Sequence, residues 1–174
     1  MSATLARHWG ERSFLQLPIR DDWHEPKKRA FGFIQSRPPQ IQGVEVPPAL
    51  AHVADAVKKS EYILQLADNW DDEGSPSYDA QTWNRAVKFV LKNAVSLWTK
   101  EYFKTDAPAI HNGPDGSIDI HWKSPVTELL VNIPADCQQP ATYYGMNKLT
   151  GGETKGKLDT SAPNEWLLMW ITAK

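Results

Sequence analysis

The chain has 174 residues, the length of a single domain, and carries a net charge of −2 at pH 7. Such a charge does not supply the strongly basic face typical of nucleic-acid-binding domains, and no stretch approaches the roughly 18–20 apolar residues of a membrane-spanning helix. The single cysteine excludes an intrachain disulfide and a thiolate zinc cluster, and the first ten residues lack the apolar core of a signal peptide. We therefore expect a soluble, cytoplasmic protein with neither a membrane nor a nucleic-acid partner.

Residues 1–47 have the composition of an extended arm rather than of a domain. Prolines recur along this segment and favour extended backbone in the residues that precede them. The arm also carries Trp23, Phe31 and Phe33, so it is too apolar for a disordered tail. Two interpretations remain open: the arm packs as one or two strands against the rest of the chain, or these aromatic side chains bind a partner.

Two helices are predicted after the arm. The first begins near Pro48, a residue suited to the first helical position, and runs to about Ala67. The second follows Asp79, which is a good N-cap, and its apolar residues recur at the spacing of one helix face. This stripe consists of Trp83, Ala86, Val87, Val90, Leu91, Ala94, Leu97 and Trp98.

After the second helix the apolar period changes to two residues, which indicates β-strands. Segments 108–112 and 117–122 flank the turn signal Gly113-Pro114-Asp115-Gly116 and are expected to pair as a hairpin. The other predicted elements are strands 127–133, 141–146 and 154–158, the last two paired as a second hairpin, and a short helix over 164–172 capped by Ser161 or Asn164.

These elements together predict an α+β fold. Two N-terminal helices pack on an antiparallel sheet of four or five strands, which a short C-terminal helix closes. Residues 48–174 form a single domain, and residues 1–47 form an extended N-terminal arm.

The order of the pieces is similar to that in a set of small bacterial proteins without an assigned activity. Those proteins carry an NWDG-like turn, a DGSI-x-I-x-W strand and a final helix that contains Trp-Leu. The counterparts here are Asn69-Trp70-Asp71-Asp72-Glu73-Gly74, Asp115-Gly116-Ser117-Ile118-Asp119-Ile120-His121-Trp122 and Trp166-Leu167. The resemblance covers about residues 60–172 and implies the fold and an origin in a mobile-element or phage-derived region, but no reaction. Asp72 departs from the pattern, which has glycine there.

The acidic turn, residues 68–73, has carboxylates at Asp68, Asp71, Asp72 and Glu73. The interpretation we favour is a junction between two helices, since carboxylates before a helix N-terminus gain roughly 0.3–1 kcal/mol each from its dipole. Asn69 and Gly74 tolerate left-handed backbone, and Trp70 is expected to anchor the turn to the core. The alternatives are a Mg²⁺ or Ca²⁺ site and a partner-binding patch made of Asp71, Asp72 and Glu73.

Two histidines flank the first predicted hairpin. His111 and His121, with Asp119 on the same strand face as His121, could ligate a transition metal. We favour the interpretation that they are polar residues on the solvated face of a half-buried sheet. The alternative function is a metal-dependent hydrolase or nuclease, in which Asp71, Asp72, Glu73, His111 and His121 converge.

The sequence contains no phosphate-binding loop, dinucleotide fingerprint or zinc-protease motif. Cys137 lies in a polar inter-strand segment without a basic neighbour to activate it, so we expect no catalytic residue and no cofactor. The function we favour is therefore a non-enzymatic interaction with another protein, as an accessory, adaptor or inhibitor. The basic run Lys27-Lys28-Arg29 is interpreted as a solvated loop, with a nucleic-acid contact there as a third possibility.

Overall fold

The computed structural model of the protein describes residues 38–172, which belong to one compact unit. The described part begins with a two-stranded antiparallel sheet, in which β1 (Gln40–Ile41) pairs with β2 (Val44–Glu45). Gln42 and Gly43 form the turn with positive φ angles of 49° and 78°, as a tight two-residue hairpin loop requires. Val46 then enters the core, where it is 1% exposed.

Three consecutive helical segments follow, namely the 3-10 helix η1 (Pro48–Leu50), the α-helix α1 (Ala51–Lys59) and the 3-10 helix η2 (Ser60–Gln65). The geometry changes at Ser60, whose hydroxyl donates to the Val57 carbonyl at 2.7 Å, a local bond that competes with regular helix. The same hydroxyl accepts the indole N–H of Trp83 at 3.0 Å. This hydrogen bond joins the end of α1 to the second long helix.

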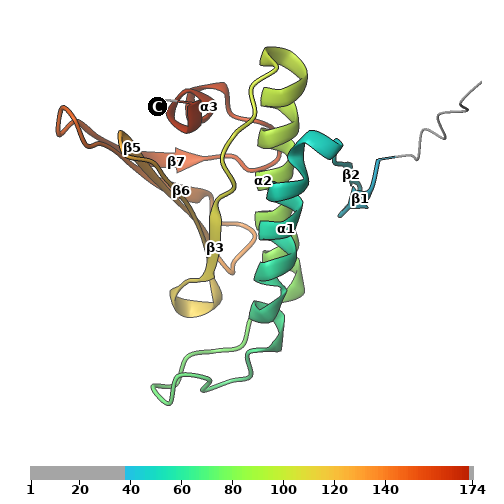
Figure 1. The fold of residues 1–174 in the computed structure, drawn as a ribbon. Coiled ribbons are helices and arrows are strands. Elements are labelled where there is room, and N and C mark those ends of the chain that lie inside the picture. Colours follow the sequence, from blue (N-terminus) through green and yellow to red (C-terminus); the bar gives the residue numbers. More distant parts are fainter. Residues whose placement is uncertain (1–37, 173–174) are drawn as a thin grey trace, which may run out of the picture. The chain divides into compact units, whose positions relative to one another are not determined.

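The second helix, α2 (Ala80–Glu101), lies alongside α1 (Figure 1). The predicted N-cap is confirmed, because the Asp79 carboxylate accepts the backbone N–H of Gln81 at 2.8 Å. The predicted apolar stripe is buried against α1 and the large sheet, with Ala86 and Val87 at 0% and Val90 at 1% exposure, apart from the half-buried Trp98. The helix ends at Glu101, and its C-cap residue Tyr102 adopts left-handed backbone with a φ of 51°.

The large sheet has five antiparallel strands in the order β3-β4-β5-β6-β7. The strands are β3 (Ala109–Asn112), β4 (Ile118–Lys123), β5 (Thr127–Ile133), β6 (Ala141–Asn147) and β7 (Glu153–Leu158), with the 3-10 helix η3 (Pro114–Gly116) in the β3–β4 turn. Along β4 and β5, buried and half-exposed residues alternate. The sheet therefore has an apolar helix-facing side, which includes Ile120 and Val131, and a polar side that we call the open face.

The last element is α3 (Glu165–Thr172), capped by the Asn164 side chain, which accepts the backbone N–H of Leu167 at 3.1 Å. Asn93 of α2 accepts the Asn164 backbone N–H at 3.1 Å and so fixes the start of α3. Trp170 of α3 packs against β6 at Gly145, where a Cβ atom would lie 3.3 Å from the ring. In the part of the chain that the structure describes, no helix is long and apolar enough to cross a membrane.

The fold predicted from the sequence is wrong in the number of sheets, in the number of strands and in the continuity of the first helix. The described residues contain seven strands in two antiparallel sheets, where one sheet of four or five strands was expected. The extra sheet occupies residues 40–45 of the predicted extended arm, and its two-residue strands are too short to show a period. The helix predicted over 48–67 is divided at Ser60. The class remains α+β, and both predicted hairpins are confirmed by the strand register.

Candidate functional site

The carboxylates of the acidic turn bind the turn's own backbone. The Asp71 carboxylate accepts the backbone N–H groups of Glu73 at 3.0 Å and Ser75 at 3.2 Å, and also the Ser75 hydroxyl. Asp68 accepts the backbone N–H of Ser77 at 2.7 Å. These hydrogen bonds lower the pKa of both carboxyl groups, through the Ser75 hydroxyl for Asp71 and the Ser77 backbone N–H for Asp68. The arrangement supports the interpretation of the turn as a structural junction.

The backbone of the acidic turn is left-handed at three positions. Asn69, Asp72 and Gly74 have φ angles of 61°, 60° and 89°, and the Asn69 side chain accepts the Gly74 backbone N–H at 2.7 Å. Asp72 therefore adopts the conformation that the glycine of the NWDG-like pattern would favour. Trp70 anchors the turn only in part: its ring centroid lies 6.4 Å from that of buried Tyr78, but the side chain remains 39% exposed.

The two histidines lie on the open face of the large sheet. His111 is exposed and stands opposite Asp119 in the β3–β4 register. His121 Nε2 lies 2.7 Å from Glu128 Oε1, and Lys148 contacts the other oxygen of Glu128 at 3.2 Å. These contacts lower the pKa of Glu128, Lys148 being the largest cause. The interpretation of a solvated sheet face agrees with these positions.

The predicted site residues are not brought together as one centre. Between residues 38 and 172 there is no group of three or more His, Cys, Asp or Glu side chains placed to hold a metal ion. Asp72 and Glu73 are exposed on the acidic turn, away from the open-face contacts of His121. The described residues do not include the aromatic residues Trp23, Phe31 and Phe33 or the basic run Lys27-Lys28-Arg29.

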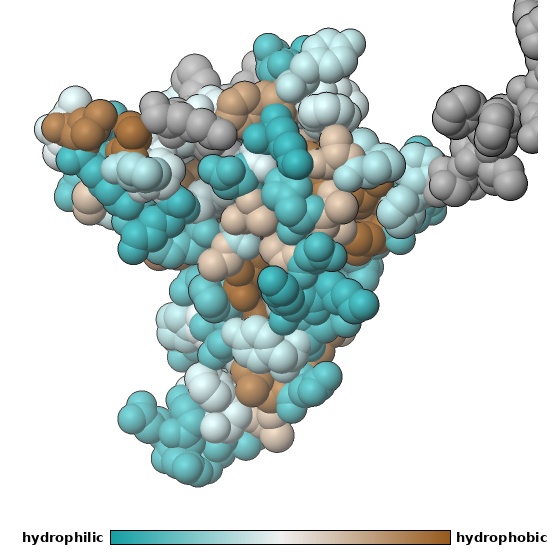
Figure 2. Space-filling view, in the orientation of Figure 1, coloured by the Kyte–Doolittle hydropathy of each residue, from teal (hydrophilic) through white to brown (hydrophobic). Residues whose placement is uncertain are grey.

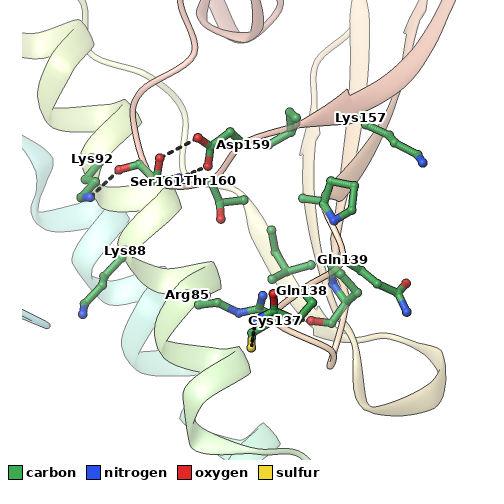
Figure 3. A pocket seen from close by; sticks show the side chains of 15 residues that line it. Arg85, Lys88, Lys92, Cys137, Gln138, Gln139, Lys157, Asp159, Thr160 and Ser161 are labelled. Atoms are coloured by element: carbon green, nitrogen blue, oxygen red, sulfur yellow. Dashed lines mark hydrogen bonds between the residues drawn. The ribbon is translucent and has the colours of Figure 1, made fainter.

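A cleft of about 720 Å³, not predicted from the sequence, lies between α2 and the ends of β5, β6 and β7 (Figure 3). We call it the basic cleft. One wall is α2, another is the segment 133–141 that joins β5 to β6, and the third is the segment 157–161 at the end of β7. Its charged lining residues are Arg85, Lys88, Lys92, Lys157 and Asp159. Four cations and one carboxylate give the cleft a net charge of +3, whereas the whole chain carries −2.

Three of the cations come from one side of α2. At about 100° per residue, Arg85, Lys88 and Lys92 fall within about 60° of one another, on the side of the helix roughly opposite the centre of the apolar stripe. Arg85 extends from the helix toward the Cys137–Gln138 segment (Figure 3) and donates from Nη2 to the Pro134 carbonyl. This bond ties the β5–β6 connection to α2.

The third wall is held by a short chain of hydrogen bonds. Lys92 Nζ donates to the Ser161 carbonyl at 2.7 Å (Figure 3). The Asp159 carboxylate accepts the Ser161 backbone N–H at 2.8 Å and its hydroxyl at 2.7 Å, and these bonds lower the pKa of Asp159. The Asp159 carboxylate therefore forms its hydrogen bonds within its own loop. Lys88 and Lys157 have no hydrogen-bond or ion-pair partner among residues 38–172, and their ammonium groups point outward from the rim of the cleft (Figure 3).

Chemically, the basic cleft can attract carboxylate or phosphate groups through ammonium and guanidinium donors. Gln138 and Gln139 add exposed amide groups at its edge, and the exposed thiol of Cys137 lies on the same segment. The cleft has no signal in local sequence, because Arg85, Lys88 and Lys92 have the spacing of an ordinary solvated helix face. Lys157 joins them only through the tertiary fold.

Comparison of the chain with protein-family profiles, with curated proteins and with solved structures gives no match. The resemblance to small bacterial proteins with an NWDG-like turn thus stays a prediction.

Proposed function

We propose that this protein acts by binding another protein, and that the basic cleft receives an acidic segment of that partner. The observation that carries the proposal is the net charge of +3 in a 720 Å³ cleft of a chain whose total charge is −2. Lys88 and Lys157 contribute two of these charges without a partner of their own in the described part. Opposite charges across an interface select the partner and speed the encounter with it.

An acidic protein segment fits this charge distribution better than a nucleic acid does. A nucleic-acid interface needs a basic face that follows a long row of phosphates. Here the basic cleft gathers four cations, and the neighbouring open face carries Asp119, Glu128 and Glu153 as well as cations. A short run of carboxylates matches a cleft of this size.

The view in Figure 2 agrees with recognition by charge rather than by a broad apolar surface. Hydrophilic residues cover most of the face shown, and hydrophobic ones appear between them in small separate groups. The accessory role, the cytoplasmic location, and the contribution of Trp23, Phe31 and Phe33 or of the acidic patch Asp71, Asp72 and Glu73 to binding belong to the same proposal.

The first test is fluorescence anisotropy with a labelled peptide of alternating threonine and glutamate. At a separation of about 6 Å in water, each unit charge contributes about 0.7 kcal/mol. Lys88→Glu changes the charge by two units, about 1.4 kcal/mol, so we expect about tenfold weaker binding. The matched control is Lys104→Glu, the same change on an exposed lysine beyond the other end of α2, and it should bind within about twofold of the unchanged protein.

Three outcomes would contradict the proposal. The first is the absence of binding to the acidic peptide, and the second is equal loss in the Lys88→Glu and Lys104→Glu variants. The third is tighter binding of a single-stranded oligonucleotide than of the peptide, with loss in the Lys88→Glu variant, which would make the cleft a nucleic-acid site instead.

A further inference from the structure

The strand beside the basic cleft, β7, lies at one edge of the large sheet. It pairs with β6 from Glu153 to Leu158 and has no second neighbour in the strand order. In an antiparallel edge strand, the N–H and C=O groups of every second residue point away from the sheet. Backbone groups of this kind need a hydrogen-bond partner or water.

The outer edge of β7 has no partner within residues 38–172. Every backbone hydrogen bond of residues 154–157 runs to β6, and none joins them to a loop or a turn of the described chain. Proteins often cover or bend such an edge, because it is a template for another strand. Here β7 contains no proline and keeps a regular register over all six of its residues.

The side chains of β7 carry positive charge on the open face. Lys155 and Lys157 are exposed and separated by one residue, so they lie on the same side of the strand. The carboxylate of Glu153 instead accepts the Tyr144 hydroxyl, a bond that raises the pKa of Tyr144. Neither Lys155 nor Lys157 has a hydrogen-bond or ion-pair partner in the described part of the chain.

Lys157 connects the basic cleft to a second hollow. This hollow, of about 410 Å³, lies on the open face beside β7 and is lined by Leu130, Thr142, Tyr144 and both lysines. Lys157 lines the hollow and the cleft alike, so the two form one continuous surface along the strand.

We propose that the acidic segment of the partner binds as an added strand on the free edge of β7, with alternate carboxylates against Lys155 and Lys157. This inference rests on the proposed function and specifies how the acidic segment binds. Main-chain hydrogen bonds supply affinity in such strand addition, and alternate side chains supply specificity. Charge favours an acidic occupant: in the antiparallel register centred on Gly156, a second copy of this chain would bring its own Lys155 and Lys157 against the same lysines, whereas glutamates at every second position would face both lysines.

The test uses the full chain and three acidic peptides of alternating threonine and glutamate. One peptide is unmodified, one is N-methylated at every threonine and one at every glutamate. Because alternate amides of a strand point to opposite edges, each modified peptide lacks the donors of one edge only. We expect one modified peptide to bind at least tenfold more weakly than the unmodified peptide and the other to bind within about twofold of it. Hydrogen exchange should slow at alternate amides of β7 when the unmodified peptide is bound.

The outcomes separate this inference from the proposed function. If both methylated peptides bind as the unmodified one does, and only Lys88→Glu weakens binding, the acidic segment is recognised by charge alone and strand addition is wrong. If no acidic peptide binds, both proposals fail. If the chain dimerises and protection of β7 follows protein concentration rather than peptide, the occupant is a second copy, which overturns the inference.

Discussion

The hydrogen bond between Ser60 and Trp83 joins η2 to the helix that carries the basic cleft, and Ser60→Ala measures its contribution. Both side chains are buried, at 1% and 4% exposure, and the Ser60 hydroxyl accepts the indole N–H at 3.0 Å. Removing the hydroxyl leaves a buried donor without a partner, which costs about 1–3 kcal/mol. The Val57 carbonyl keeps another partner, because it also accepts the Ser60 backbone N–H. We therefore expect the free energy of unfolding to fall by about 2 kcal/mol.

A double-mutant cycle with Trp83→Phe isolates this bond. Phenylalanine keeps most of the apolar ring but has no N–H group that could be left without an acceptor. In that background Ser60→Ala should therefore lower the free energy of unfolding by less than about 0.5 kcal/mol. Urea unfolding followed by far-UV circular dichroism measures all four proteins, with an unchanged dependence on urea as the check for two-state behaviour. Equal cost of Ser60→Ala in both backgrounds would refute the reasoning.

Three further predictions test other parts of the fold. Tyr102→Gly should raise the free energy of unfolding by about 0.5–1 kcal/mol in urea titrations, because Tyr102 has a φ of 51° and is 82% exposed; a loss of stability would show that its ring matters. Gly145→Ala should lower it by about 1–3 kcal/mol and change tryptophan fluorescence, because the new Cβ would lie 3.0 Å from Thr154 Cγ2 and 3.3 Å from the Trp170 ring; an unchanged fluorescence spectrum would place α3 elsewhere. The Lys148 contact lowers the pKa of Glu128 in the folded protein, so its contribution is present above the ordinary value of 4.5 and is lost as pH falls through the folded pKa. Thermal unfolding of Glu128→Gln should therefore show a deficit at pH 7 that disappears in acid, and a deficit independent of pH would contradict this account.

Elements with a long, regular period could be predicted from the sequence. The apolar stripe of α2 and the alternation of β4 and β5 each reflect one surface that must be buried, so their positions follow from spacing. The Asp79 cap was predictable for a similar reason, because its partner, Gln81, lies only two residues away.

Features that depend on distant partners could not be predicted. The division of the first helix at Ser60 reflects a hydroxyl shared between Val57 and Trp83, and nothing in local sequence identifies Trp83 as the donor. The sequence of the acidic turn suggested a metal site or a partner-binding patch as alternatives, because it shows the carboxylates but not the backbone N–H groups from which they accept hydrogen bonds. The basic cleft could not be predicted because its cations are far apart in the sequence and come together only when β7 packs beside α2.

The central claim, that the basic cleft binds an acidic segment of another protein, is tested most directly by site-specific crosslinking in extract of the source cells. Cys137 is exposed, lines the cleft and is the only cysteine in the chain, so it accepts a photo-crosslinker without further substitution. The control carries the same probe at residue 104, as Lys104→Cys with Cys137→Ser. We predict one protein crosslinked through an acidic stretch from Cys137, lost when Lys88→Glu and Lys157→Glu are combined and absent from the control. Crosslinks that are unaffected by the charge reversals, or equally abundant from residue 104, would contradict the claim.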